Sequence, residues 1–254
     1  MYNGSSVFLR VAAAVALCMA IAQPAVAQQL RRSSIWDLKI NQPVSAQPAW
    51  VEYKGYGCGS NGGPILKRIH GFESFAECPK DADGLHEVYF EYDDELEYIA
   101  RAVDNPTAVD RFVGTGDSGH PIMTSARFND AGILKALRVI TDPRADYVIQ
   151  GDGRLDVRGR ESAYQYAALL AARWNITPAT DCTPLAPAEG ETAIGDTFVK
   201  QRCQHVEAGK KVRLVLESNY YRKPGQTYRD PNLPTKLTEG QFESSARMDI
   251  IAID

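Results

Sequence analysis

One acidic run could supply acid–base chemistry. Glu91, Asp93, Glu95 and Glu97 are spaced two residues apart. On an extended strand such neighbours lie about 6.5–7 Å apart, near the carboxyl spacing of an inverting glycosidase. That chemistry also requires burial to hold one carboxyl group protonated, whereas a face made almost entirely of acids is normally solvated and keeps ordinary pKa values. The run therefore predicts a solvated strand face, with a catalytic pair or a weak cation site as alternatives.

A second run, Gly116-Asp117-Ser118-Gly119-His120-Pro121, could present a serine nucleophile. It resembles the Gly-Asp-Ser-Gly-Gly-Pro sequence around the nucleophile of chymotrypsin-like serine proteases and departs from it at His120. The resemblance implies a histidine base and an orienting aspartate elsewhere in the chain. Upstream, His70 and His86 lack the Ala-Ala-His-Cys context of that base. We interpret the run as a flexible turn before a strand that starts near Ile122, and we predict no catalytic residue.

The cysteines predict two disulfides. Of the five cysteines, Cys18 lies in the leader described below, and Cys58, Cys78, Cys182 and Cys203 remain, an even number that suits an oxidising compartment. Three pairings are possible. We expect Cys58–Cys78 and Cys182–Cys203 because each closes a local loop, which would contribute about 3 kcal/mol. The absence of a C-x-x-C spacing argues against a zinc site.

The histidines do not form a metal-binding pattern. His70, His86, His120 and His205 never occur in an H-x-H or H-E-x-x-H spacing. Residues 152–156 begin like a calcium loop but carry arginine where an oxygen ligand is needed. We therefore predict no metal centre and no cofactor.

Aromatic and guanidinium side chains gather near the C-terminus, at Tyr220, Tyr221, Arg222, Tyr228 and Arg229. We expect them in a loop between two strands. Tyrosine and arginine are favoured in interfaces, and on a loop they could hold a sugar, a peptide or a partner protein. Alternating tyrosines are also ordinary sheet surface. These residues are our candidate interaction surface, and both interpretations stay open.

Residues 1–27 have the three parts of a cleavable export signal. A polar start ends in Arg10, an apolar core runs from Val11 to Ala22, and Ala25-Val26-Ala27 is a small-x-small cleavage site. The core is shorter than the roughly 20 residues of a membrane-spanning helix. Its alanine content is typical of a bacterial signal. We predict cleavage after Ala27 and export to the periplasm, with no transmembrane segment.

The composition fits a soluble periplasmic domain over residues 28–254, with two small lobes (28–150 and 151–254) as an alternative. The net charge is −4, and no basic cluster occurs, which argues against a nucleic-acid partner.

Hydrophobic patterning predicts an α+β fold built mainly of antiparallel hairpins with one main helix. Alternation predicts strand structure over 86–101, with one acidic, solvated face that includes Glu87. Residues 93–95 bend or break this run, which gives either a bulged strand or a hairpin. Strands over 122–128 and 133–141 flank the turn 129–132. Helical spacing predicts a helix over 162–174 that ends before Pro178.

Further elements follow from turn residues. The Gly-rich segment 55–64 predicts a loop, residues 72–78 a short helical turn and residues 81–84 a second turn. Two long strands, 211–221 and 241–253, should pair antiparallel across a loop that contains Pro224, Gly225, Pro231 and Pro234.

The sequence shows no complete nucleophile–base set, metal-ligand set or cofactor fingerprint. This favours an exported, non-catalytic binding or interaction protein of the bacterial envelope, whose partner would be an envelope protein, a peptide or a glycan. The alternatives are a periplasmic hydrolase or lyase acting on an envelope polymer or small molecule, with a site assembled from scattered residues, and a structural accessory subunit.

Overall fold

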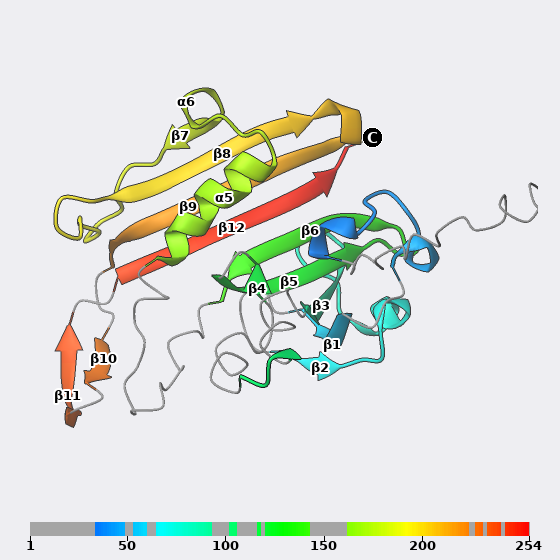
Figure 1. Ribbon diagram of the computed structural model, residues 1–254, viewed down its shortest axis with the longest axis horizontal. Coiled ribbons are helices and arrows are strands. Elements are labelled where there is room, and N and C mark those ends of the chain that lie inside the picture. The colour runs from blue at the N-terminus through cyan, green and yellow to red at the C-terminus, as the bar shows by residue number, and fades with distance from the viewer. Residues whose placement is uncertain are drawn as a thin grey trace, which may run out of the picture. The chain divides into compact units, whose positions relative to one another are not determined.

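The computed structural model places most of its strands in one antiparallel sheet (Figure 1). It describes residues 34–48, 53–59, 65–92, 102–105, 116–117, 120–142, 162–223, 227–230, 233–239 and 242–253. Within these ranges, ten strands form the sheet in the order β2-β1-β3-β5-β6-β12-β9-β8-β7, with β4 paired to β5. As predicted, the fold is mainly antiparallel sheet with one main helix and two disulfides.

The strands are β1 (Tyr53–Cys58), β2 (Lys67–Arg68), β3 (His86–Tyr92), β4 (Gly116–Asp117), β5 (His120–Phe128), β6 (Leu134–Thr141), β7 (Cys182–Pro184), β8 (Val199–Glu207), β9 (Val212–Arg222), β10 (Thr227–Asp230), β11 (Leu233–Glu239) and β12 (Phe242–Ala252). The helices are the α-helices α5 (Tyr166–Arg173) and α6 (Pro178–Asp181) and the 3-10 helices η1 (Ile35–Asp37), η2 (Val44–Ala46), η3 (Phe72–Glu77), η5 (Ala163–Gln165) and η6 (Ala208–Lys210).

A local hairpin forms the middle of the sheet. Strands β5 and β6 flank the turn at residues 129–132, where the Asn129 side chain accepts hydrogen bonds from the backbone N–H groups of Ala131 and Ile133. Gly132 closes the turn with a φ of 71°, in the left-handed region that favours glycine. The predicted hairpin is confirmed.

The last strand joins the two halves of the chain into one sheet. As predicted, β12 pairs antiparallel with β9, from Phe242 opposite Arg222 to Ala252 opposite Val212. Its other edge pairs with β6. The predicted connecting loop differs from the structure in one respect, because it contains the small two-stranded sheet β10–β11.

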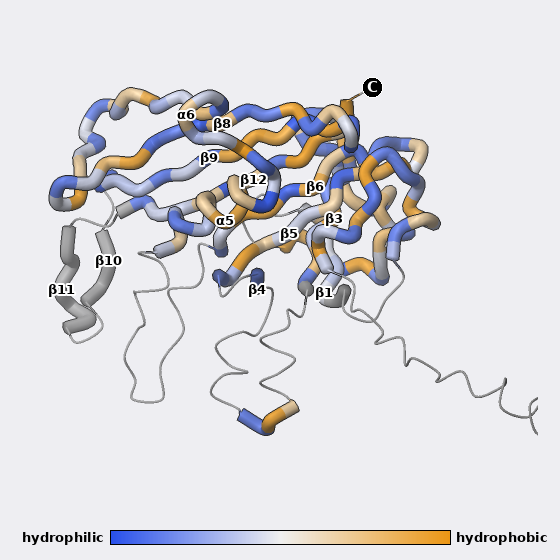
Figure 2. Tube along the Cα trace, turned by 45° about the horizontal axis from the view of Figure 1, so that its top comes forward, coloured by the Kyte–Doolittle hydropathy of each residue, from blue (hydrophilic) through white to orange (hydrophobic). Residues whose placement is uncertain are grey.

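The two faces of the sheet have different chemistry, since successive side chains of a strand point to opposite faces. Along β9, Leu214 and Leu216 are buried on the face that we call the helix face. Arg213, Val215 and Glu217 alternate with them on the opposite face. Figure 2 shows hydrophilic and hydrophobic residues mixed along β8 and β9.

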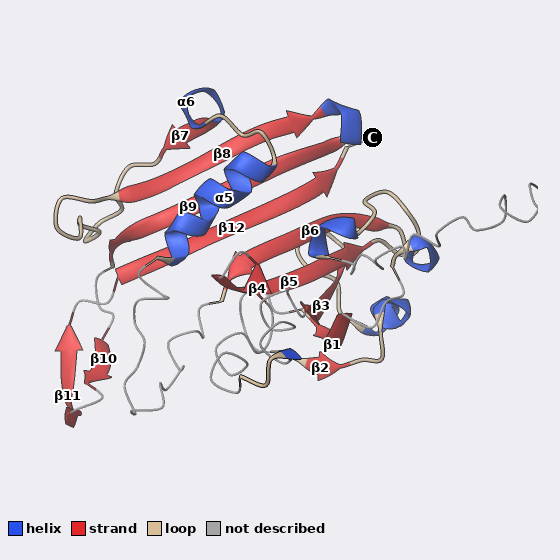
Figure 3. Ribbon diagram, viewed as in Figure 1, coloured by secondary structure: helices blue, strands red, loops and turns tan. Residues whose placement is uncertain are grey.

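The main helix covers part of the helix face (Figure 3). It comprises η5 and α5, within the predicted range 162–174. Tyr166, Ala167 and Leu170 are buried in one core with the leucines of β9. Pro178 occupies the first turn of α6, after the main helix has ended. No helix of the described residues has the length and hydropathy to cross a membrane.

The Gly-rich segment is partly a strand, which corrects the prediction of a loop over 55–64. Gly55 has a φ of 62°, and the register of β1 against β3 shifts between Lys54 and Gly57. A Cβ atom on Gly57 would overlap the side chain of Ile65. The glycines that suggested a turn therefore permit a bulged strand and close packing.

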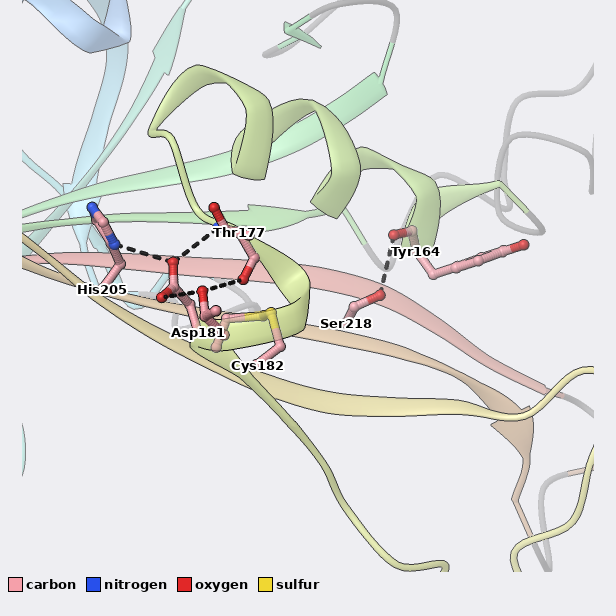
Figure 4. Close-up of a disulfide and its surroundings, with 8 residues drawn as sticks. Tyr164, Thr177, Asp181, Cys182, His205 and Ser218 are labelled. Atoms are coloured by element: carbon pink, nitrogen blue, oxygen red, sulfur yellow. Dashed lines mark hydrogen bonds and ion pairs between the residues drawn. A yellow bond between two sulfur atoms is a disulfide. The ribbon is translucent and has the colours of Figure 1, made fainter.

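Two disulfides join neighbouring elements with the expected connectivity. Cys58 on β1 is bonded to Cys78, which follows η3. Cys182 and Cys203 are directly opposite each other on β7 and β8. Beside the second bond, the carboxylate of Asp181 accepts a hydrogen bond from the backbone N–H of Thr177 and contacts His205 (Figure 4).

Candidate functional site

Arginines from successive strands line a groove on the face opposite α5. They are Arg127 on β5, Arg138 on β6, Arg247 on β12, Arg213 on β9 and Arg202 on β8. The groove has a volume of about 590 Å³, and most of its other lining side chains are polar or charged. We call this set of five residues the arginine face.

Acidic partners neutralise the β5–β6 end of the arginine face. Arg127 is only 3% exposed and contacts the carboxylates of Asp81 and Asp83. Burial alone would raise the pKa of Asp81, but hydrogen bonds from the Leu85 N–H and Arg127 hold it below its usual range. Buried charges require such pairing, so this end of the groove is structural.

A second buried network corrects the prediction that Glu87 lies on a solvated acidic face. Glu87 Oε1 lies 3.0 Å from a terminal nitrogen of Arg138, and both side chains are buried. Asp249 Oδ1 accepts a 2.7 Å hydrogen bond from Arg138 Nε. Arg138, on another strand, allows the Glu87 carboxylate to be buried. The alternation within one strand does not reveal such a partner.

The β8–β9 end of the arginine face carries the accessible charge. Arg213 is exposed and makes no ion pair within the part of the chain that the structure describes. The Arg202 side chain is 49% exposed, and its Nε lies 3.8 Å from Glu217. Val215 and Gln204 lie between these arginines in the groove. The result is a polar surface with one guanidinium group that has no described acidic partner, a second that is paired with Glu217, and a small apolar floor.

This geometry suits an extended anionic ligand. A guanidinium group binds a carboxylate or a phosphate through paired N–H donors. Arg202 lies opposite Glu217, which is four residues from Arg213 on β9, so the two arginine backbones are separated by roughly 13 Å along the strands. Two acidic groups on one elongated molecule could each meet one arginine while its body rests on Val215.

The predicted interaction residues on β9 are divided between its two faces. Tyr220 stacks on Tyr164, with ring centroids 4.5 Å apart. Tyr221 is buried and stacks on Phe198 at 5.5 Å, and burial, followed by the charge of nearby Glu191, raises its pKa to about 12. Both residues therefore lie within β9, in agreement with the predicted strand 211–221, and not in the loop that follows it.

The other members of the predicted surface lie at or beyond the strand end. Arg222 is exposed at the end of β9. Tyr228 and Arg229 belong to β10, where they pair with Thr238 and Leu237 of β11. An interaction role for this segment stays a prediction.

The serine-protease-like run forms a corner beside the helix. Asp117 and His120 are paired between β4 and β5, and Ser118 lies outside the described residues. The Tyr166 hydroxyl donates a 2.7 Å hydrogen bond to Asp117, and the His120 ring packs against that of Tyr166. Burial lowers the pKa of His120, although Asp117 opposes the shift. Asp117 thus ties the helix to the sheet.

The remaining candidates are only partly described. In the acidic run, Glu91 accepts a hydrogen bond from Tyr89, and Asp93, Glu95 and Glu97 lie outside the described residues. Within the described ranges, no three His, Cys, Asp or Glu side chains form a metal-binding group.

The chain matches no protein-family profile, no curated protein and no solved structure. The functional argument therefore rests on the geometry of the residues. A signal for the arginine face exists in the sequence, because charged residues lie at positions of one strand face. These are Arg213 and Glu217 in one segment and Arg247 and Asp249 in another, and the residues between them are apolar. The pairing of these two strands was predicted from the sequence; what sequence reasoning missed is that β12 also pairs with β6 and β9 with β8, which brings the other arginines into the same groove.

Proposed function

We propose that this protein is an exported, non-catalytic binding protein of the bacterial envelope, and that its arginine face holds an acidic glycan. The observation that carries the proposal is the exposed Arg213, which has no acidic partner among the described residues and shares one groove with Arg202. An uncompensated guanidinium beside a polar groove is a site for an anionic group.

The lining favours a glycan over a peptide. Many peptides are recognised at a free sheet edge or in an apolar groove, and arginine clusters recognise phosphorylated or acidic peptides. This groove lies across a sheet face, and its aliphatic lining is limited to Leu85, Val215 and Ile251. Guanidinium groups and Gln204 instead offer donors to carboxylates and hydroxyl oxygens.

Export is supported by the leader pattern and the two disulfides. Amino-terminal sequencing of the protein released from the periplasm tests it. We expect a chain that begins at Gln28. A chain that retains Met1 and stays in the cytoplasm would contradict export without bearing on the groove.

Ligand binding is tested by calorimetry with tetragalacturonate, a short carboxylated glycan, at low salt. Because hydrogen bonds to charged groups contribute about 1.5–3 kcal/mol each, changing both Arg202 and Arg213 to glutamine should weaken binding by at least about tenfold. Arg222→Gln is the matched control, because Arg222 is exposed at the end of the same strand and points to the opposite face.

The control also separates two surfaces. Loss of affinity in Arg222→Gln alone would place the site on the segment 220–229, which we call the tyrosine-rich segment. Equal affinity in all three proteins, or no heat of binding to the wild type, would refute the arginine face as a glycan site.

A further inference from the structure

A small pocket lies on the helix face, between the end of α5 and the segment 36–40. Its volume is about 320 Å³, at the lower end of the range for small-molecule sites. Leu137, Val212 and Ile250, from β6, β9 and β12, form its floor and are each only 2% exposed. The floor is therefore part of the rigid core.

Two tryptophans form a wall of this pocket. Trp36 belongs to η1 and Trp174 caps the C-terminal end of α5. Their rings meet edge to face, with centroids 6.2 Å apart. Leu38 and Ile40 complete the apolar lining. Aromatic and aliphatic walls of this kind bury the body of an apolar ligand.

The charge at the pocket is positive. Lys210 is the charged member of the described lining, and its Nζ lies 4.3 Å from the centroid of the Trp174 ring. Arg173 lies in the same way over Trp36, at 4.7 Å, but it also forms an ion pair with Asp117 at 3.8 Å, so Lys210 carries the positive charge of the pocket. No carboxylate is found among the lining residues that the structure describes.

One polar atom on the wall lacks a partner. Nε1 of Trp174 is buried, and it is the single buried side-chain nitrogen or oxygen without a hydrogen bond in the described part of the chain. The equivalent Nε1 of Trp36 donates to Asp117. Buried N–H groups are normally paired, so the indole N–H of Trp174 is a donor that the described part of the chain leaves unsatisfied.

We infer that this pocket binds a small apolar carboxylate. The apolar body would lie on the Leu137–Val212–Ile250 floor against the two indole rings. The carboxylate would pair with the Lys210 ammonium group, at the pocket edge where that side chain is exposed. A neutral apolar molecule would fill the same space but would gain nothing from Lys210. The inference concerns the face opposite the proposed glycan site and does not depend on it.

The test uses the oxidised mature protein with 3-cyclohexylpropionate and its neutral amide as probes. Trp36 and Trp174 are two of the three tryptophans in the chain, so binding should produce a saturable change in tryptophan fluorescence. We expect the carboxylate to bind about tenfold more tightly than the amide, because a charged hydrogen bond is stronger than a neutral one.

Three variants locate the binding. Lys210→Gln should remove the preference for the carboxylate and leave amide binding unchanged. Because this side chain is exposed, we expect the variant to fold like the wild type. Lys211→Gln is the matched control: it is one residue along, also exposed and outside the lining, and it should keep the preference. The Arg202→Gln and Arg213→Gln double variant should also keep it.

The inference is overturned by any of three results. These are no saturable fluorescence change with either probe, equal affinity for carboxylate and amide in the wild type, and loss of carboxylate binding in the arginine double variant. The last would place the carboxylate on the arginine face.

Discussion

Arg138 on β6 reaches over β5 to form an ion pair with Glu87 on β3, at 3.0 Å between nitrogen and oxygen. The residue of β5 opposite Arg138 is the small, buried Ser125. The pair thus links two strands that are not hydrogen-bonded to each other.

Glu87→Gln should lower the free energy of unfolding by about 3 kcal/mol, because it leaves the buried guanidinium with less compensation. Urea denaturation measures the change. Glu217→Gln is a matched control on the same face, where the longer and more exposed pair with Arg202 should contribute less than about 1 kcal/mol. An equal loss of unfolding free energy in both variants would show that burial does not determine how much these ion pairs stabilise the protein.

The mature protein should contain no free thiol, since Cys58–Cys78 and Cys182–Cys203 are bonded. Alkylation without reductant, followed by peptide mapping, should show no modified cysteine and should recover both linked peptides. Replacing Cys182 and Cys203 together by serine should cost about 3 kcal/mol of stability, because each disulfide restricts the unfolded chain. Alkylation of two or more cysteines in periplasmic protein would contradict this framework.

Stability should fall on acidification below about pH 4. Despite its burial, Asp81 has a pKa held below its usual range by the Leu85 N–H and Arg127. A hydrogen bond from Lys80 lowers the pKa of Asp130. The unfolded chain therefore takes up protons first, so the stabilisation is complete above about pH 4 and is lost as pH falls through the folded pKa values.

Thermal melting across this acid range measures the effect. Asp81→Asn should be less stable at neutral pH and should lose less of its stability on acidification. A wild-type melting temperature that stays constant between about pH 5 and about pH 2 would contradict the linkage.

Tyr221→Ala should lower stability by about 3 kcal/mol, because the ring is 7% exposed and packs on Phe198 and a large core side chain is lost. Tyr221→Phe should keep most of the stability. Arg222→Ala, at the exposed neighbouring position, should melt like the wild type. If Tyr221→Ala melts normally and instead loses a captured partner, the ring is an interface anchor.

Locally encoded elements could be predicted from the sequence. The turn at Asn129–Gly132 carries its own side-chain hydrogen bonds, and each disulfide closes a short segment. The failures involve partners that are distant in the chain. Glu87 was expected to be solvated because its partner, Arg138, lies 51 residues away. Gly55 and Gly57 indicated a turn because glycine is common in turns. The prediction was wrong because glycine also occurs in bulged strands and where side chains pack closely.

The candidate site was missed for the same reason. Arg138 and Asp249 are 111 residues apart, and their contact depends on the insertion of β12 between β6 and β9. Alternation within one strand predicts which side chains share a face, but strand order decides which arginines line one groove. The tyrosine-rich segment could be identified from the sequence because its residues are close together in the chain.

The most direct test of the arginine face is a titration of the ¹⁵N-labelled mature protein with tetragalacturonate, followed by NMR. The Nε–Hε signals of Arg202 and Arg213 and the backbone signals of Gln204 and Val215 should shift together and saturate. Signals from the helix face, including Leu170, should stay in place. Shifts confined to Tyr220–Arg222 or to the helix face, or no shift at all, would contradict the account.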